Sequence, residues 1–353
     1  MDRKTVLRAL RTLTDQGVVQ HTGQRTCIVA PATLAQSTLL GQTIVILTSY
    51  PPRNTPAPQP GWADLLTQGA MSGVNDIDHN ALMVHGQRLL GTLNRCLQHP
   101  PAGILVTEMR KDIPGFLEGL ERLHQAGVKL AVYSGSSEFD QYDRVRSDHE
   151  AGAYQLTRWL IDKGCGRILP LWEAMPAGPG TPPQEPTTYW VRQRRAGYER
   201  AMREAHLAPL APLTMPDFPE MDWGTNRFEG AVRVIAGYLA EAMTGDTAVD
   251  GIMTMTDRTV YGVSAACRLF GRRPGKDVRL VGYDNYYQDC QSFFAAVAPQ
   301  SVGPQATMDK QNDLMGRELV KLLMDRIEGK LPPEPQCRMV APKFVPGEPV
   351  VNE

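Results

Sequence analysis

Apolar and polar residues alternate along most of the chain in a pattern that predicts strands and helices in turn. The β-branched apolar run TIVILTS at 43–49 predicts a buried strand, and the mixed pattern at 61–77 predicts a helix. Further strands are predicted at 81–85, 102–107, 128–134, 167–172, 251–256 and 278–284. Further helices are predicted at 89–98, 113–127, 149–164, 189–206, 226–243, 258–271 and 313–329. Repeated strand–helix units are typical of parallel sheets with helices on both faces, so we expect an α/β fold with two lobes in series.

Residues 1–30 follow a different pattern. Val6, Leu10 and Leu13 lie on one face of a predicted helix that begins at the start of the chain and ends near Gly17. Residues 18–30 contain two short β-prone runs around a turn, which predicts a small hairpin. Residues 31–42 are small and polar, and we interpret them as a linker.

The charge of the chain is nearly balanced, with a net charge of −1, but it is unevenly distributed. Residues 1–30 hold five basic and two acidic residues, a net charge of +3. This excess is compatible with a nucleic-acid-binding module, and equally with a solvated helix face. No apolar signal segment or membrane-spanning run is present in the sequence, so we expect a cytoplasmic protein and no membrane partner.

The six cysteines are scattered and form no CxxC pair. We expect reduced thiols and predict no metal site and no cofactor. Catalytic motifs such as HExxH and GxSxG are missing from the sequence, and GRRPGK at 271–276 is one residue short of a P-loop. We therefore expect that the chain is not an enzyme.

Four phrases of the chain resemble, in the same order, those of the LacI/GalR family of repressors. They are VRSDHEAGAYQLTRWLIDKGCGRIL, RQRRAGYERAMREAHL, DGIMTMTDRTVYGVSAACRLFGRRPGKDVRLVGYDN and ATMDKQNDLMGRELVKLLMDRIEG. The resemblance implies a periplasmic-binding-protein-like domain of two Rossmann-like lobes over 43–353, with a small-molecule effector in the cleft between them. It places lobe 1 at about 43–164 and 309–334, and lobe 2 at about 165–308 and 335–353. A periplasmic receptor of the same fold is the alternative for this region.

The effector-binding residues are predicted from two sources. The carboxyl ends of the predicted strands contribute Ser49, Tyr50, Ser134, Trp172, Thr256, Asp257 and Asp284. The family resemblance adds Arg194, three residues before Gly197, and Trp223, and it places Asp284 on the family's effector-binding Asp. An Arg donor fork, an Asp acceptor and an aromatic face suit a sugar.

Several of these positions have alternative explanations. Arg194 lies in a basic run with Arg192 and Arg195, so the sequence leaves open which of them points inward. Asp284 also fits a turn, and an Asp in the position of Asp257 is more often the N-cap of a helix than a ligand. Trp172 and Trp223 fit either a core or a pocket. Thr256 and Ser134 also depart from the Asn and Asp that are common in the family.

The first thirty residues resemble the second half of a GntR-type winged helix. The matching residues imply DNA contacts from the helix and the wing: Arg3, Lys4, Thr5, Arg8, Gly23 and Arg25. A GntR-type head on a LacI-type body is a hybrid arrangement of sugar-catabolism repressors of the arabinose-repressor type. The first half of such a head is missing from this sequence, and a short helix with a two-stranded wing is marginally stable by itself.

Together these patterns predict a partial winged helix at 1–30, a linker at 31–42 and an effector-binding domain at 43–353. We expect a ligand-responsive transcriptional repressor that binds operator DNA as a homodimer and senses a sugar. The alternative is a cytosolic sugar-binding sensor that does not bind DNA because its head is truncated.

Overall fold

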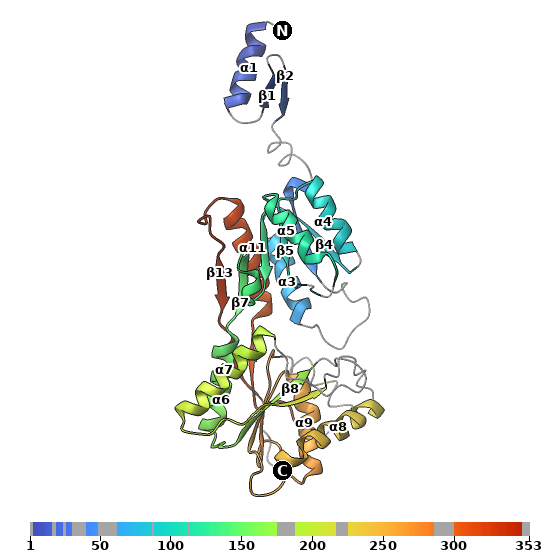
Figure 1. The fold of residues 1–353 in the computed structure, drawn as a ribbon, viewed down its shortest axis with the longest axis vertical. Coiled ribbons are helices and arrows are strands. Elements are labelled where there is room, and N and C mark those ends of the chain that lie inside the picture. Colours follow the sequence, from blue (N-terminus) through green and yellow to red (C-terminus); the bar gives the residue numbers. More distant parts are fainter. Residues whose placement is uncertain are drawn as a thin grey trace. The chain divides into compact units, whose positions relative to one another are not determined.

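The computed structural model describes residues 3–15, 19–23, 26–29, 40–48, 62–86, 88–109, 111, 113–174, 188–216, 225–285 and 300–347. These residues divide into two compact units. Unit 1 holds the described residues up to Arg146 together with Asn312–Arg338. Unit 2 holds Ser147–Gln311 and the described residues from Met339 onward. Each unit contains a six-stranded sheet flanked by helices, which confirms the predicted α/β fold (Figure 1).

The sheet of unit 1 has the strand order β13-β7-β6-β5-β3-β4. Its strands are β3 (Thr43–Thr48), β4 (Asn80–His85), β5 (Gly103–Val106), β6 (Leu130–Tyr133), β7 (Asp143–Ser147) and β13 (Cys337–Val340). Its helices are η1 (Leu40–Gln42), α3 (Trp62–Asn75), α4 (Arg88–Gln98), α5 (Phe116–Gln125), η2 (Ser137–Phe139) and α11 (Asn312–Ile327). The strands from β4 through β7 pair in parallel, as repeated strand–helix units require.

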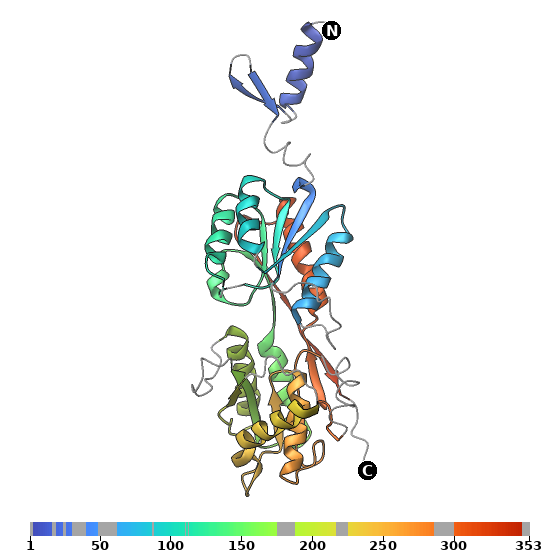
Figure 2. The ribbon, with the colours of Figure 1, turned by 90° about the vertical axis from the view of Figure 1, so that its right-hand side faces the viewer.

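Helices cover both faces of this sheet, with α4 and α5 on one side and α3 and α11 on the other (Figure 2). Apolar side chains of α4 and α5, such as Leu93 and Leu120, join the strand residues in a buried cluster. Helices α3 and α11 approach so closely that a Cβ on Gly316 would lie 2.2 Å from the Leu66 carbonyl oxygen. Glycine is therefore required at this helix contact.

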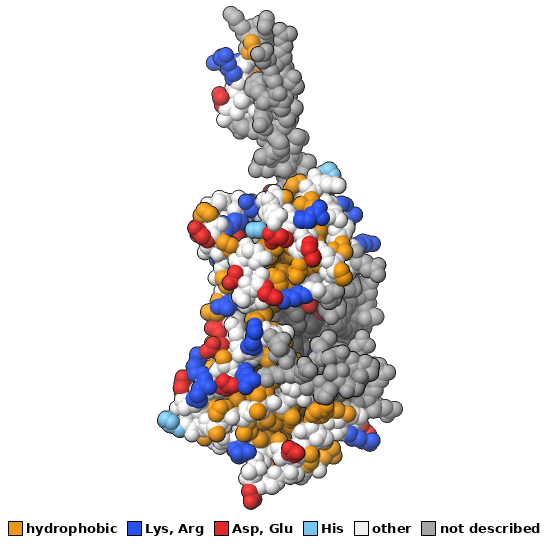
Figure 3. Space-filling view, in the orientation of Figure 1, with side chains coloured by type: hydrophobic (Ala, Val, Ile, Leu, Met, Phe, Trp, Pro, Cys, Tyr) orange, Lys and Arg blue, Asp and Glu red, His pale blue; other side chains and the backbone are white. Residues whose placement is uncertain are grey.

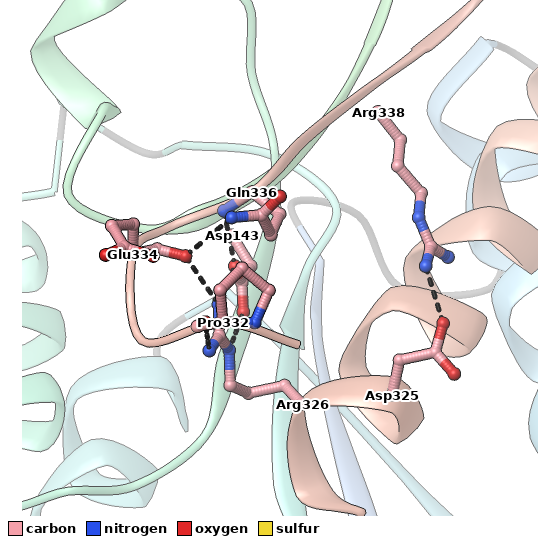
Figure 4. Close-up of polar contacts among 7 residues, drawn as sticks. All are labelled: Asp143, Asp325, Arg326, Pro332, Glu334, Gln336 and Arg338. Carbon is pink, nitrogen blue, oxygen red and sulfur yellow. Dashed lines mark hydrogen bonds and ion pairs between the residues drawn. The ribbon is translucent and has the colours of Figure 1, made fainter. Parts of the chain in front are cut away.

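The last part of unit 1 is held by a buried ion pair between two segments distant in sequence (Figure 4). Arg326 of α11 reaches Asp143 of β7 through two contacts, Nε–Oδ2 at 2.7 Å and Nη2–Oδ1 at 2.8 Å. Arg326 also donates to the carbonyl oxygens of Pro332 and Glu334. The Gln336 backbone N–H donates to Asp143 Oδ1 at 2.7 Å, so one carboxylate joins β7, α11 and the segment before β13.

The sheet of unit 2 has the strand order β14-β12-β11-β10-β8-β9. Its strands are β8 (Ile168–Ala174), β9 (Leu213–Pro216), β10 (Gly251–Thr254), β11 (Arg279–Val281), β12 (Ala306–Asp309) and β14 (Lys343–Pro346). Its helices are α6 (His149–Asp162), α7 (Tyr189–Glu204), α8 (Thr225–Met243) and α9 (Asp257–Leu269). Strand β14 pairs antiparallel with β12, whereas the other neighbours are parallel.

The N-terminal residues form helix α1 (Arg3–Asp15) and an antiparallel hairpin of β1 (Val19–Gly23) and β2 (Thr26–Val29). The predicted helix and hairpin are thereby confirmed as secondary structure. Val6 and Leu7 are exposed on the helix surface.

The boundary between the units differs from the predicted lobe boundary. Along the described residues, the chain first passes between units at Arg146 and Ser147, and α6 belongs to unit 2, not to the lobe that begins at 43. The physical reason is that α6 packs against α7, which also belongs to unit 2. The return segment in unit 1 is Asn312–Arg338 in place of the predicted 309–334. Among the described residues, no helix is long and apolar enough to span a membrane.

Candidate functional site

Parallel strands bring several of the predicted residues to one edge of the unit 2 sheet. Strands β10 and β11 are neighbours, so Met255–Asp257 and Gly282–Asp284 follow at the same carboxyl edge. Thr256 occupies the N-cap position of α9, and Asp257 is its first residue, fully buried. A Cβ on Gly282 would lie 1.9 Å from Asp257 Oδ1. The two strand ends are therefore in direct contact.

Arg194 is the arginine of the basic run that points inward. Its side chain lies on α7 and the residue is only 3% exposed. By contrast, Arg192 is exposed and Arg195 pairs on the surface with Glu199. The outer surface over α6 and α7 carries interleaved basic and acidic side chains (Figure 3). Burial thus distinguishes Arg194 from Arg192 and Arg195, which lie at the surface.

The guanidinium of Arg194 is held by a carbonyl and two aromatic rings. Nη1 donates to the Met255 carbonyl oxygen at 2.7 Å. The guanidinium carbon lies 3.5 Å from the centroid of the Tyr283 ring and 4.9 Å from that of Trp190. Within the described residues, Arg194 Nε has no hydrogen-bond partner. A stacked guanidinium with a free N–H is suited to donate to a ligand.

Two glycines allow α7 and the Tyr283 ring to take these positions. A Cβ on Gly197 would lie 2.2 Å from the Glu150 carbonyl oxygen of α6, so the two helices touch backbone to backbone. A Cβ on Gly152 would lie 2.2 Å from the Tyr283 hydroxyl oxygen. The spacing Arg194-x-x-Gly197 therefore combines an inward arginine with the close helix contact that places it.

Asp284 follows β11 in a left-handed conformation, with φ of 89°. Its backbone N–H donates to the Met308 carbonyl oxygen at 2.8 Å, and the residue is 6% exposed. Its Oδ1 lies 3.7 Å from Arg194 Nη2 and 2.8 Å from the ammonium nitrogen of Lys310. Because non-glycine residues rarely adopt positive φ, the neighbouring strand must hold this conformation in place.

Lys310 is a member of this cluster that the sequence pattern did not predict. It directly follows β12, a short strand that was also not predicted, and it is 5% exposed. Burial lowers the pKa of Lys310, and the adjacent Asp284 carboxylate opposes this shift. A lysine in a short, mixed segment gives no local signal of burial, and only the β11–β12 pairing brings it to Asp284.

The remaining predicted effector residues are distributed differently. Trp172 is fully buried and packs in the apolar core of unit 2 with Tyr198 and Met202, which favours the core alternative over an effector contact. Ser134 belongs to unit 1, where its Oγ accepts a hydrogen bond from the Ser136 backbone N–H at 3.2 Å. Ser49, Tyr50 and Trp223 lie outside the described residues.

The predicted DNA contacts lie on α1 and the hairpin. The side chains of Thr5 and Arg8 are exposed on α1. Arg3 and Lys4 lie in the first turn of the same helix, and Gly23 pairs with Thr26 in the hairpin. Arg25 lies outside the described residues. Among the residues that the structure describes, no group of three or more His, Cys, Asp or Glu side chains is placed to hold a metal ion.

Two curated bacterial regulators are similar to the chain in sequence. The HTH-type transcriptional regulator CelR of Thermobifida fusca is 28% identical over 233 residues, which cover 65% of this chain and 57% of CelR. The HTH-type transcriptional repressor PurR of Vibrio campbellii is 25% identical over 229 residues, which cover 65% of this chain and 58% of PurR. The chain thus spans less than two thirds of the length of these relatives.

A solved structure, described as a complex of the transcriptional regulator CelR with cellobiose, has the same fold. It aligns with a TM-score of 0.63 and 20% sequence identity over 99% of this chain and 92% of that chain. The sequence profile of the periplasmic binding protein-like domain family matches residues 157–350, more than half of the chain. The chain therefore belongs to the family of periplasmic binding protein-like domains.

Proposed function

We propose that the chain is a ligand-responsive transcriptional repressor whose small-molecule effector is bound by Arg194 and Asp284. The observation that carries this proposal is the buried Arg194–Asp284 pair at the carboxyl edge of the unit 2 sheet, with a free N–H on Arg194. The similarity of the chain to CelR and PurR supports a regulatory role. The proposal includes no enzymatic activity.

The chemistry of the pair favours a sugar. Arg194 offers a fixed donor, and Asp284 offers a carboxylate that accepts from hydroxyl groups. The cellobiose in the name of the similar CelR structure supports a carbohydrate effector. We further propose, as effector contacts, the remaining predicted residues except Trp172: Ser49, Tyr50, Ser134, Thr256, Asp257 and Trp223.

The effector proposal is tested by thermal unfolding of the full chain with monosaccharides, cellobiose and sugar phosphates. A ligand present at 100 times its Kd stabilises the folded state by about 2.7 kcal/mol. For a domain of this size, that corresponds to a rise in Tm of about 5–10 °C. We expect Arg194→Ala and Asp284→Asn to abolish the rise, whereas the surface variant Arg195→Ala keeps it. An undiminished rise in both site variants contradicts the assignment.

DNA binding is proposed for α1 and the hairpin as part of a GntR-type winged helix, with Arg3, Lys4, Thr5, Arg8, Gly23 and Arg25 as contacts. The exposed Thr5 and Arg8 support this role, because contacts to bases and phosphates require accessible polar side chains. We also propose that the protein is a homodimer in the cytoplasm, which suits a palindromic operator.

The second candidate is a sugar sensor that does not bind DNA, and the exposed Val6 and Leu7 on α1 favour it. Selection of DNA fragments from a random pool with the full chain separates the two functions. A repressor enriches a defined sequence, and Arg8→Ala weakens its binding. A chain that enriches no sequence but still binds a sugar is the sensor.

A further inference from the structure

Lys310 places a second buried positive charge beside Asp284. Its ammonium nitrogen lies 2.8 Å from Asp284 Oδ1, whereas the nearest Arg194 nitrogen lies 3.7 Å from the same oxygen. All three residues are at least nine-tenths buried. The carboxylate therefore lies closer to Lys310 than to Arg194, although the proposed function assigns no role to Lys310.

Arg194 alone is poorly placed to hold this carboxylate. Its Nη1 is committed to the Met255 carbonyl oxygen, and its plane is fixed by stacking on Tyr283. At 3.7 Å, Nη2 lies beyond hydrogen-bond distance of Asp284 Oδ1. A buried carboxylate without a close cation readily takes up a proton and then loses its strength as an acceptor.

The other charged groups around the pair do not replace Lys310. Asp309, next to Lys310 on the chain, accepts from the Gln311 backbone N–H and from Asn285 Nδ2. Asp148, before α6, acts on the Tyr283 hydroxyl as a further negative charge. Both are acids and add negative charge to this set of residues. Lys310 and Arg194 are the two cations in the set.

We propose that Lys310 is a positioning residue that keeps Asp284 ionised and fixes one of its oxygens, so that the other is presented to the effector. The inference rests on the proposed function of Arg194 and Asp284. The backbone of Asp284 is already held by its N–H contact to Met308, which leaves the side chain as the part that Lys310 fixes.

The first test needs no ligand. Tryptophan fluorescence of the full chain reports mainly on unit 2, because Trp159, Trp172 and Trp190 lie there, whereas Trp62 is the one described tryptophan of unit 1. In Lys310→Met, we expect Asp284 to take up a proton when the protein folds. The variant should therefore be most stable at low pH and should lose stability as pH rises. One such proton changes the unfolding equilibrium constant up to tenfold per pH unit relative to wild type.

The matched variants isolate this effect. Lys310→Met with Asp284→Asn has no carboxyl group to protonate, so its pH dependence should return to that of Asp284→Asn. The exposed Lys276→Met should follow wild type. Lys310→Gln is a second variant if Lys310→Met does not fold. A Lys310 variant whose stability has the same pH dependence as wild type overturns the proposal.

The second test uses any sugar that raises the Tm of wild type. We expect Lys310→Met to bind that sugar at least about tenfold more weakly at pH 6, with partial recovery at pH 8, and Lys310→Arg to retain affinity. Equal affinity of Lys310→Met and wild type at both pH values contradicts the proposal. If no sugar binds wild type, the proposed effector fails, while the ligand-free experiment still decides the role of Lys310.

Discussion

Replacement of Asp143 by Asn tests whether one buried ion pair holds unit 1 together. Asp143 is 5% exposed and receives two contacts from Arg326 and one from the Gln336 backbone N–H. In Asp143→Asn the guanidinium loses its counter-ion but keeps its bonds to the carbonyl oxygens of Pro332 and Glu334.

The expected cost follows from burial. Removing one partner of a buried pair typically costs about 3–5 kcal/mol, because the other charge stays buried. The bonds that Arg326 keeps to two carbonyl oxygens reduce this value, so we expect a loss of about 2–3 kcal/mol. For a domain of this size, that lowers Tm by about 4–12 °C. Urea unfolding followed by circular dichroism measures the free energy directly.

Asp140→Asn is the matched control. Its side chain is 61% exposed and lies 2.5 Å from Nη2 of Arg144, so the same substitution removes an ion pair whose carboxylate is solvated, close by in the chain. Such pairs contribute about 0–1 kcal/mol. If the two variants differ by less than about 0.5 kcal/mol, burial does not set the value of the Asp143 pair, and the argument is refuted.

Three further predictions concern stability. Gly197→Ala should lower the free energy of unfolding by about 2–3 kcal/mol, because its Cβ would collide with the α6 backbone. Gly237→Ala, in open space on α8, should raise the free energy of unfolding by about 0.5–1 kcal/mol, and urea unfolding compares the two variants. Burial raises the pKa of Cys267 to about 12, so stability should fall as pH rises from about 9, and Cys267→Ala should lessen this fall. Hydrogen bonds from Arg273 lower the pKa of Asp277, so its contribution should be lost as pH falls below about 4, and acid titration of Asp277→Asn should lack this component.

The sequence predicted most elements with strong periodic patterns, and it was less informative about short ones. Strand β3 is an unbroken apolar run, and the structure buries every residue of it. Strand β7 (DRVRS) has a single apolar residue, Val145, and its Asp143 is buried only because Arg326 arrives from far along the chain. No local pattern contains that information.

The same limit applies to the candidate site. The spacing to Gly197 marked Arg194 within its basic run, and the structure shows it buried next to Asp284. Trp172 was also predicted from its position at the carboxyl end of a strand. Its side chain instead lies in the apolar core, because both faces of this sheet are covered. Whether Arg194 and Asp284 bind an effector stays a prediction for the ligand experiments.

The contact between α3 and α11 has a consequence for biosynthesis. The two helices touch through Gly69 and Gly316, and Arg317 pairs with Asp76, so part of unit 1 is synthesised only after almost all of unit 2. A ribosome-bound chain that ends before residue 312 therefore exposes the apolar face of α3 that α11 later covers. During translation, this face stays uncovered until α11 (Asn312–Ile327) has emerged from the ribosome.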